Sequence, residues 1–247
     1  MQNQAHATLF ASTLSANFSD FEESARYSLL QRLVPAIRHH LMGEFQSVGV
    51  LAAMMDRRLQ AATPHLVSLR EDSLSLGNVS TKAANSSVNL MTWIAPDKSA
   101  TLKVDAGVNE CLGLLSTELR LKGFVIVNEV HDCDAEIFST ALRSVLTAAL
   151  IALSDLSEAA ADVVLRVQSL PERVELTIDL RPNSARTKGV RPTPSRLLGW
   201  RDVEILALAE NVKLTRAQGV VQLDFPRRLA NMPRSNSNCS HIMGVSS

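Results

Sequence analysis

The sequence predicts an α+β protein in which an N-terminal helical hairpin precedes a mixed half, with helices covering one face of a sheet. Three observations predict this fold: apolar residues recur at steps of three and four through residues 20–96, Ala95-Pro-Asp-Lys98 interrupts the pattern, and short alternating segments follow. Such steps line one helix face, whereas alternation is typical of strands. The predicted regions are a flexible lead-in at 1–19, the hairpin at 20–96, an α/β sandwich at 99–227 and a disordered tail at 228–247.

The first hairpin helix is predicted to begin near Ser19-Asp20, a pair suited to capping, and to end at the turn 60–64. Pro35 lies inside it and predicts a kink or a break, because proline has no backbone N–H. The helix carries one apolar stripe, which consists of Val34, Ile37, Leu41, Phe45, Val48, Ala52, Met55 and Leu59.

The second helix repeats the pattern with small residues in the middle of its stripe, which would let a partner helix approach closely. The stripe consists of Leu66, Leu69, Ser73, Leu76, Ser80, Ala83, Ser87, Leu90 and Ile94. One hairpin cannot cover all of its own apolar surface, so the sequence predicts a homodimeric four-helix bundle. We expect Val48, Leu76 and Ala83 in the dimer seam.

The mixed half is predicted to contain helices at 105–122, 138–154 and 195–211, the last capped by Ser195. A polar loop is predicted at 181–194. The predicted strands are 100–104, a buried strand at 124–127, a hairpin of 161–167 with 174–180, and a closing strand at 220–225.

Composition excludes several classes of protein. Lys and Arg number 25 against 25 Asp and Glu, and this formal charge of zero argues against broad electrostatic capture of nucleic acid. Three cysteines without paired spacing argue against a disulfide scaffold and favour a reducing compartment. The N-terminus lacks a basic leader with an apolar block, and no stretch approaches the roughly 20 apolar residues that span a bilayer. We therefore expect a cytoplasmic protein without a nucleic-acid or membrane partner.

Two adjacent histidines, His39 and His40, are the main chemical candidates. At about 100° per residue, His39 lies about 200° from Leu41 and points away from the apolar stripe, whereas His40 lies at its flank beside Ile37. An exposed imidazole is largely unprotonated near neutral pH and is a nucleophile toward phosphorus. The alternatives are that His39 is a solvated surface residue and that His40 is a packing residue.

The segment Ile37-Arg-His-His-Leu-Met-Gly-Glu-Phe-Gln46 resembles the phosphoacceptor helix of the sensor histidine kinases. In that family a histidine lies midway along the first hairpin helix and is followed by an acidic and then a hydrophobic residue. The resemblance makes His39 the phosphoacceptor and Leu41 the hydrophobic residue. It places His40 where the acid is usual, as a candidate base or orienting group. The resemblance extends over residues 20–226 and implies a family-type ATP-binding fold for the α/β half.

That ATP-binding half departs from the family pattern in its metal ligands. The family holds magnesium and the triphosphate with asparagines on one helix, and Thr147 and Ile151 occupy the corresponding positions in the segment 143–155. Isoleucine offers no oxygen to a hard cation such as magnesium.

The adenine segment and the lid glycines depart as well. Asp179-Leu-Arg181 follows a strand where the family has Asp-x-Gly, but it lacks the glycine, and Gly189 and Gly199 form no Gly-x-Gly pair. Lys188 and Arg191 are candidate anion ligands, although a charged loop is the commoner explanation. Phosphoryl transfer from ATP depends on positioning and charge neutralisation, so these losses together predict a degenerate site.

The leading hypothesis is a two-component signalling protein: a dimeric histidine phosphotransferase that relays phosphoryl groups between response regulators through His39. Efficient ATP-dependent autophosphorylation is not expected, and no cofactor is assigned. The partners would be receiver domains, and they would dock on the face that carries Arg38, Met42 and Gln46. His131-Asp-Cys-Asp134 is interpreted as a surface loop, because four adjacent residues rarely close a metal site. Neither a metal site nor a nucleotide site is assigned.

Two alternatives remain open. A non-catalytic pseudokinase scaffold would regulate a signalling partner by binding alone. A divergent but active histidine kinase would use nucleotide contacts other than those of the family.

Overall fold

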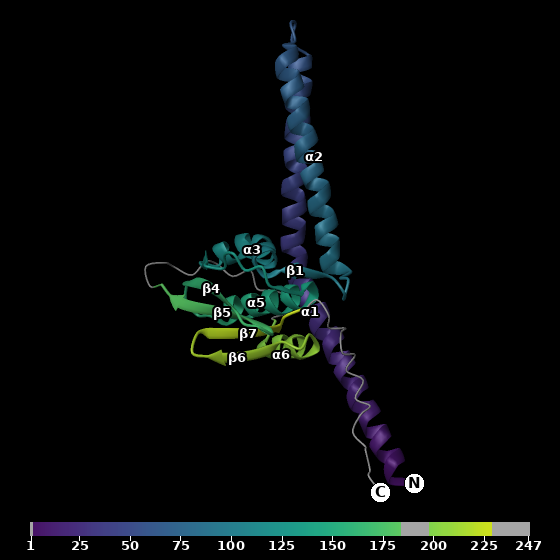
Figure 1. Ribbon diagram of the computed structural model, residues 1–247. Coiled ribbons are helices and arrows are strands. Elements are labelled where there is room, and N and C mark those ends of the chain that lie inside the picture. The colour runs from purple at the N-terminus through teal and green to yellow at the C-terminus, as the bar shows by residue number, and fades with distance from the viewer. Residues whose placement is uncertain (1, 184–197, 229–247) are drawn as a thin grey trace.

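The computed structural model describes residues 2–183 and 198–228, with side chains described from Phe18 onward. Helices α1 (Gln2–Leu59) and α2 (Leu66–Ile94) form the predicted hairpin, which projects beyond the α/β domain (Figure 1). The backbone is helical from Gln2, although the sequence predicted a flexible lead-in as far as residue 19. Pro35 does not break the helix, and Figure 1 shows α1 changing direction where it passes the α/β domain.

The α/β domain is built on a five-stranded sheet in the order β2-β4-β5-β7-β6. The first pair, β2 with β4, is parallel, and the other neighbours are antiparallel. A separate two-stranded ladder joins β1 (Thr101–Lys103) to β3 (Glu136–Phe138). The strands of the main sheet are β2 (Val125–Asn128), β4 (Ala161–Ser169), β5 (Arg173–Pro182), β6 (Lys213–Ala217) and β7 (Val220–Pro226).

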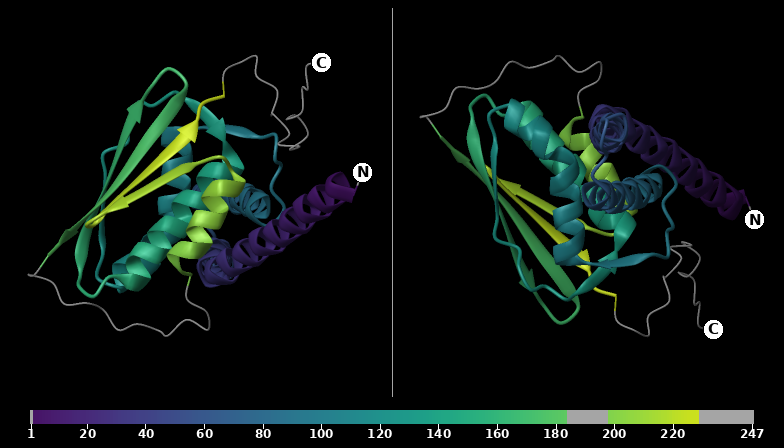
Figure 2. Two further views of the ribbon diagram at one scale, coloured as in Figure 1. Left: turned by 90° about the horizontal axis from the view of Figure 1, so that it is seen from below. Right: turned by 90° about the horizontal axis from the view of Figure 1, so that it is seen from above.

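Helices α3 (Val104–Leu121), α5 (Thr147–Leu156) and α6 (Trp200–Ala209) lie on one face of this sheet (Figure 2). The predicted helix at 138–154 is divided into α4 (Ser139–Ala141), the π-helical η1 (Leu142–Leu146) and α5. The predicted α+β class, a helical hairpin followed by an α/β layer, is therefore confirmed.

Several details differ from the sequence prediction. Strands β3 and β6 were not predicted, and β2 is a half-exposed edge strand rather than a buried one, because its outer side has no neighbour in the described sheet. Helix α6 begins at Trp200 with Gly199 as its N-cap, so the predicted start at Ser195 is wrong. Ser195 itself, most of the predicted loop at 181–194 and the predicted tail after Arg228 lie outside the described residues.

The segment Ser139–Leu156 has the length and hydropathy of a membrane span, but 89% of it is buried inside the domain. It forms the central helix of the core, where residues from Thr147 to Asp155 are all buried. A helix that is apolar on all sides is expected in such a position, because its neighbours surround it.

The hairpin and the domain share one hydrophobic core. Ala25, Leu29, Leu33 and Ile37 of α1 are between 0% and 9% exposed, and they belong to the same cluster of buried residues as the inner faces of α3, α5 and α6. These four residues follow one another at steps of four, which keeps them on a continuous line along the helix. The root of the hairpin is thus a structural part of the α/β domain.

A buried ion cluster lies beside this shared core. Lys122 Nζ donates to Asp155 Oδ1 at 2.6 Å and forms a 2.6 Å ion pair with Glu118 Oε1. Arg32 of α1 donates to Glu118 at 2.8 Å and to both Asp155 oxygens at 3.1 Å. The Asp155 and Lys122 side chains are only 3% and 6% exposed, so their charges depend on each other and on Arg32.

Replacing Asp155 by alanine is expected to lower the free energy of unfolding by about 3–5 kcal/mol, because Lys122 and Arg32 would remain buried without this carboxylate. Denaturant titration followed by circular dichroism measures the change. Asp134→Ala is the matched control, since Asp134 pairs with Lys103 at the surface, and its unfolding free energy is expected to be unchanged. Equal stability losses in the two variants would contradict the assignment.

Candidate functional site

His39 lies on the exposed side of α1, two residues beyond Ile37, the last fully buried residue of that helix. The side facing α2 carries Leu41 and Val48, which are half-buried, and His39 points away from it as the sequence predicted. The helix backbone therefore presents the His39 imidazole to solvent from a firmly packed root.

His40 faces a different environment, at the junction of the hairpin with α3. Its Nε2 lies 4.0 Å from Glu44 Oε1, and Lys82 Nζ of α2 lies 3.4 Å from the same oxygen. His40 also lines a cavity of about 210 Å³ together with Asn89 of α2 and Asn109 of α3. The His40 side chain is 41% exposed, so it is neither a core packing residue nor fully solvated.

The predicted partner face is available on the described chain. Arg38, Met42 and Gln46 are all exposed and follow one another at steps of four on the side of α1 that includes His39. Met42, at 55% exposed, is the apolar member of this face and lies between the polar Arg38 and Gln46.

The residues predicted for the dimer seam lie on the faces that α1 and α2 turn toward each other. Ala83 is 2% exposed in the single chain, and Val48 and Leu76 are half-buried. The hairpin's own two helices thus already cover these positions. The uncovered large apolar residues of the hairpin beyond Leu33 are a second set, of which the predicted stripes contained only Val34, Phe45, Leu59, Leu66 and Ile94. The others are Met42, Val50 and Met54 of α1, and Val67, Leu74, Val88 and Met91 of α2.

The helix expected to hold magnesium offers it no ligand. Thr147 is 0% exposed and Ile151 is 1% exposed, and both lie within the core. Every residue from Ala148 to Leu153 is apolar and buried, so a shift of register would not supply an oxygen either. The polar residues that follow, Ser154 and Asp155, are bound by Lys122.

Asp179, in the segment that was predicted to have lost the Asp-x-Gly pattern, lies on the face of the sheet opposite the helices. Its neighbours Ile178 and Leu176 are 0% exposed, and alternation along β5 therefore directs Asp179 away from the helices. Its carboxylate accepts a hydrogen bond from Arg181 Nε at 2.8 Å and lies 3.5 Å from Arg166 of β4. The candidate anion ligands Lys188 and Arg191, like Gly189, lie outside the described residues.

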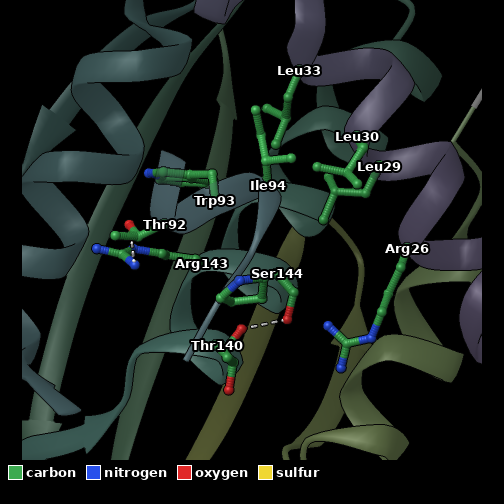
Figure 3. A pocket seen from close by; sticks show the side chains of 11 residues that line it. Arg26, Leu29, Leu30, Leu33, Thr92, Trp93, Ile94, Thr140, Arg143 and Ser144 are labelled. Atoms are coloured by element: carbon green, nitrogen blue, oxygen red, sulfur yellow. Dashed lines mark hydrogen bonds between the residues drawn. The ribbon is translucent and has the colours of Figure 1, made fainter. Parts of the chain in front are cut away.

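Two further cavities lie in the α/β half and at its junction with the hairpin. One of about 420 Å³ is lined by Leu153, Leu180, Trp200 and Arg216, with Arg216 stacked 4.5 Å from the Trp200 ring, and no carboxylate lines it. The other, of about 100 Å³, lies between α1, the end of α2 and η1 (Figure 3). Its volume is well below the roughly 300 Å³ at which ligand pockets begin.

The described residues contain few groups suited to bind a metal ion or to act as a thiol nucleophile. No group of three His, Cys, Asp or Glu side chains among them is arranged to hold a metal ion, including those of the segment 131–134. Burial raises the pKa of the Cys111 thiol to about 12. This thiol is therefore unsuited to act as a nucleophile, because the thiolate is the reactive form.

Cys111 is expected to resist iodoacetamide in the folded protein at mildly alkaline pH and to react fully once the chain is unfolded in guanidinium chloride. Peptide mapping by mass spectrometry of a Cys239→Ser variant measures the alkylated fraction at Cys111. Rapid alkylation of Cys111 in the folded protein would contradict its burial.

The chain matches no family model and no curated protein. Solved structures of histidine kinases do match. The Acinetobacter baumannii histidine kinase AdeS aligns at 14% identity and a TM-score of 0.40, over 75% of this chain and 98% of that one. A histidine kinase from Burkholderia phymatum STM815 aligns at 12% identity and a TM-score of 0.41, over 79% and 97%.

A third match is the histidine kinase ThkA in a complex with the response regulator protein TrrA, at 13% identity and a TM-score of 0.38, over 85% of this chain and 66% of that one. All three TM-scores are below 0.5, and the α+β fold is established by the strand order and helix placement of this chain itself.

Proposed function

We propose that this protein is a dimeric histidine phosphotransferase of two-component signalling, which accepts a phosphoryl group on His39 and passes it to another partner. The observation that carries the proposal is the exposure of His39 on the unburied side of a long helix, beside an exposed face with Arg38, Met42 and Gln46. A nucleophile on a rigid element can be reached by a large partner without rearrangement of its own backbone.

The reaction needs few groups from this chain. A neutral imidazole nitrogen of His39 attacks the phosphorus of an aspartyl phosphate on a receiver domain, an N–P bond forms, and the P–O bond to the aspartate carboxylate breaks. The same steps in reverse pass the phosphoryl group to a second receiver. His40, held beside Glu44, is a candidate to accept or orient a proton next to His39.

ATP-dependent autophosphorylation is not part of the proposal, because the residues that the structure describes, 2–183 and 198–228, do not fit a magnesium nucleotide. The helix that should hold the metal is apolar from Ala148 to Leu153, and Asp179 faces away from it. Incubation with magnesium and γ-labelled ATP is therefore expected to leave the protein unlabelled.

The exposed apolar residues of the hairpin support pairing of two chains. Of the predicted stripe on α1, Ile37 is buried, while Val34, Phe45 and Leu59 are 53%, 55% and 52% exposed. A stripe that one neighbouring helix covers only in part is expected in a four-helix bundle, where a second hairpin covers the rest. Burial of these side chains supplies the driving force.

His39→Ala is expected to abolish transfer from a receiver phosphorylated by a small-molecule phosphodonor, because no other nucleophile lies at that position. Transfer is measured as acid-labile phosphate on this protein. His131→Ala, which also removes an exposed histidine, is expected to transfer normally. Full transfer by His39→Ala would exclude this function and favour the scaffold alternative, in which the histidine is dispensable.

Phe45→Glu combined with Val88→Glu is expected to convert a dimer, at twice 26.9 kDa, into a monomer, because both charges would fall in the apolar face between two hairpins. Sedimentation equilibrium measures the mass. Leu208→Glu is the control, since Leu208 is likewise an exposed apolar residue, at 65%, but belongs to α6 and not to either hairpin helix. A wild-type protein that sediments as a monomer would contradict the pairing.

A further inference from the structure

The part of α1 from Ala25 to Leu33 buries its apolar side chains against the α/β domain, so these side chains become exposed only if the two parts separate. Ala25, Leu29 and Leu33 are 0%, 5% and 1% exposed, and they lie in one core with α3, α5 and α6. Moving the domain away from α1 would bring both of these faces into water. The hydrophobic effect therefore opposes any separation of the two parts.

The ion cluster adds a polar lock to this apolar contact. Arg32 is the only member on α1, and it reaches Glu118 of α3 and Asp155 of α5 at 2.8 Å and 3.1 Å. The Arg32 side chain is 11% exposed. If α1 moved away, Asp155 would lose one of its two cationic partners in a site from which water is largely excluded.

Two other polar contacts secure the same junction at different points. Arg26 of α1 donates to Glu210 at 2.6 Å, and Glu210 also accepts from Thr140 at 2.9 Å. The Glu210 side chain is 6% exposed. This contact attaches α1 to the residue that caps the end of α6.

The third contact secures the end of α2. Glu110 of α3 accepts from Trp93 Nε1 at 2.8 Å and from Arg143 at 3.0 Å. Arg143 in turn donates to Thr92 at 2.8 Å and lies 5.6 Å from the centre of the Trp93 ring. Both helices of the hairpin are therefore attached to the domain, and neither can pivot while the other stays fixed.

We propose that the hairpin and the α/β domain form one permanently docked body, with the Arg32–Glu118–Lys122–Asp155 cluster as its lock. The α/β domain then stays at a fixed position beside His40, and the His39 side remains open to another protein. This inference concerns the geometry of the chain and stands whether or not phosphotransfer occurs.

The direct test is a distance measurement between the two parts in the whole chain. Spin labels are placed at exposed positions, by Ser75→Cys on α2 and Thr215→Cys on β6, in a Cys239→Ser background with Cys111 and Cys133 buried. Double electron–electron resonance measures the distance between the two labels. Dilution with unlabelled chains ensures that both labels belong to one chain. One narrow distribution, unchanged by magnesium and ATP, is expected. A broad or bimodal distribution in this parent protein would overturn the proposal.

Arg32→Ala tests the role of the lock, and Arg166→Ala is the matched control. Arg166 also pairs with two carboxylates, those of Glu129 and Asp179, but on the open face of the sheet. In Arg32→Ala, amide hydrogen exchange over residues 25–37 is expected to rise at least tenfold and the distance distribution to broaden. Both should stay unchanged in Arg166→Ala. Equal exchange rates in the two variants would show that the cluster is not the lock.

If Arg32→Ala does not fold, as circular dichroism would reveal, Glu118→Gln provides the second variant, because Glu118 is a member of the cluster whose side chain is 22% exposed, and the change weakens its pairing with Arg32 while leaving the shared core intact. The outcome is separable from that of the phosphotransfer experiment. A narrow distance distribution together with full transfer in His39→Ala would support docking and reject the phosphotransferase function. A broad distribution together with loss of transfer in His39→Ala would reject docking and support the phosphotransferase function.

Discussion

The segment of α1 between Ala25 and Ile37 packs first against the α/β domain and then, further along the helix, against α2. Each step of four residues advances about 40° around a helix, so the buried line that begins at Ala25 has turned by about 120° when it reaches Ile37. The side first buried by the α/β domain is thereby replaced by the side that α2 covers. Both the docking of the domain and the outward orientation of His39 depend on this gradual turn.

The packing of α1 against the α/β domain also buries a group of charged side chains. At the crossing of α1, α3 and α5, the chain places Arg32, Lys122, Glu118 and Asp155 together rather than four apolar side chains. Such a cluster contributes little net stability compared with apolar packing, but it tolerates the loss of any one member poorly. It therefore favours one arrangement of the three helices over others that would bury the same apolar area.

The sequence predicted the elements whose patterns are long and local. The hairpin and α3 were found because helical periodicity over ten or more residues is a strong signal, and β4, β5 and β7 because each is a run of seven to ten residues rich in apolar side chains. Strands β3 and β6 were missed, since a three-residue strand has no measurable alternation and β6 carries polar residues at most positions. The helix start at Ser195 was placed too early, because the cap at Gly199 uses the Asp202 side chain and a backbone N–H.

The site was predictable in part for similar reasons. The outward direction of His39 follows from helix geometry alone, and the absence of side-chain oxygens between Ala148 and Leu153 follows from the identity of those residues. Spacing on α1 could not separate the half-buried Val48 from the exposed Phe45, because both belong to one run of steps of three and four. The contact of His40 with Glu44 and Lys82 also depends on how α2 is placed against α1, which one sequence does not specify.

The length of the hairpin beyond its last buried anchor has a mechanical consequence. From Ile37 to Leu59, α1 extends about 33 Å, so within a single chain the hairpin is held at one end only, and a second hairpin packed along it would stiffen the rest. Thermal bending displaces a cantilever least at its clamp and most at its tip. His39 lies only about 3 Å along the axis from that clamp, where the imidazole moves least, and the turn at the far end is left to absorb the motion.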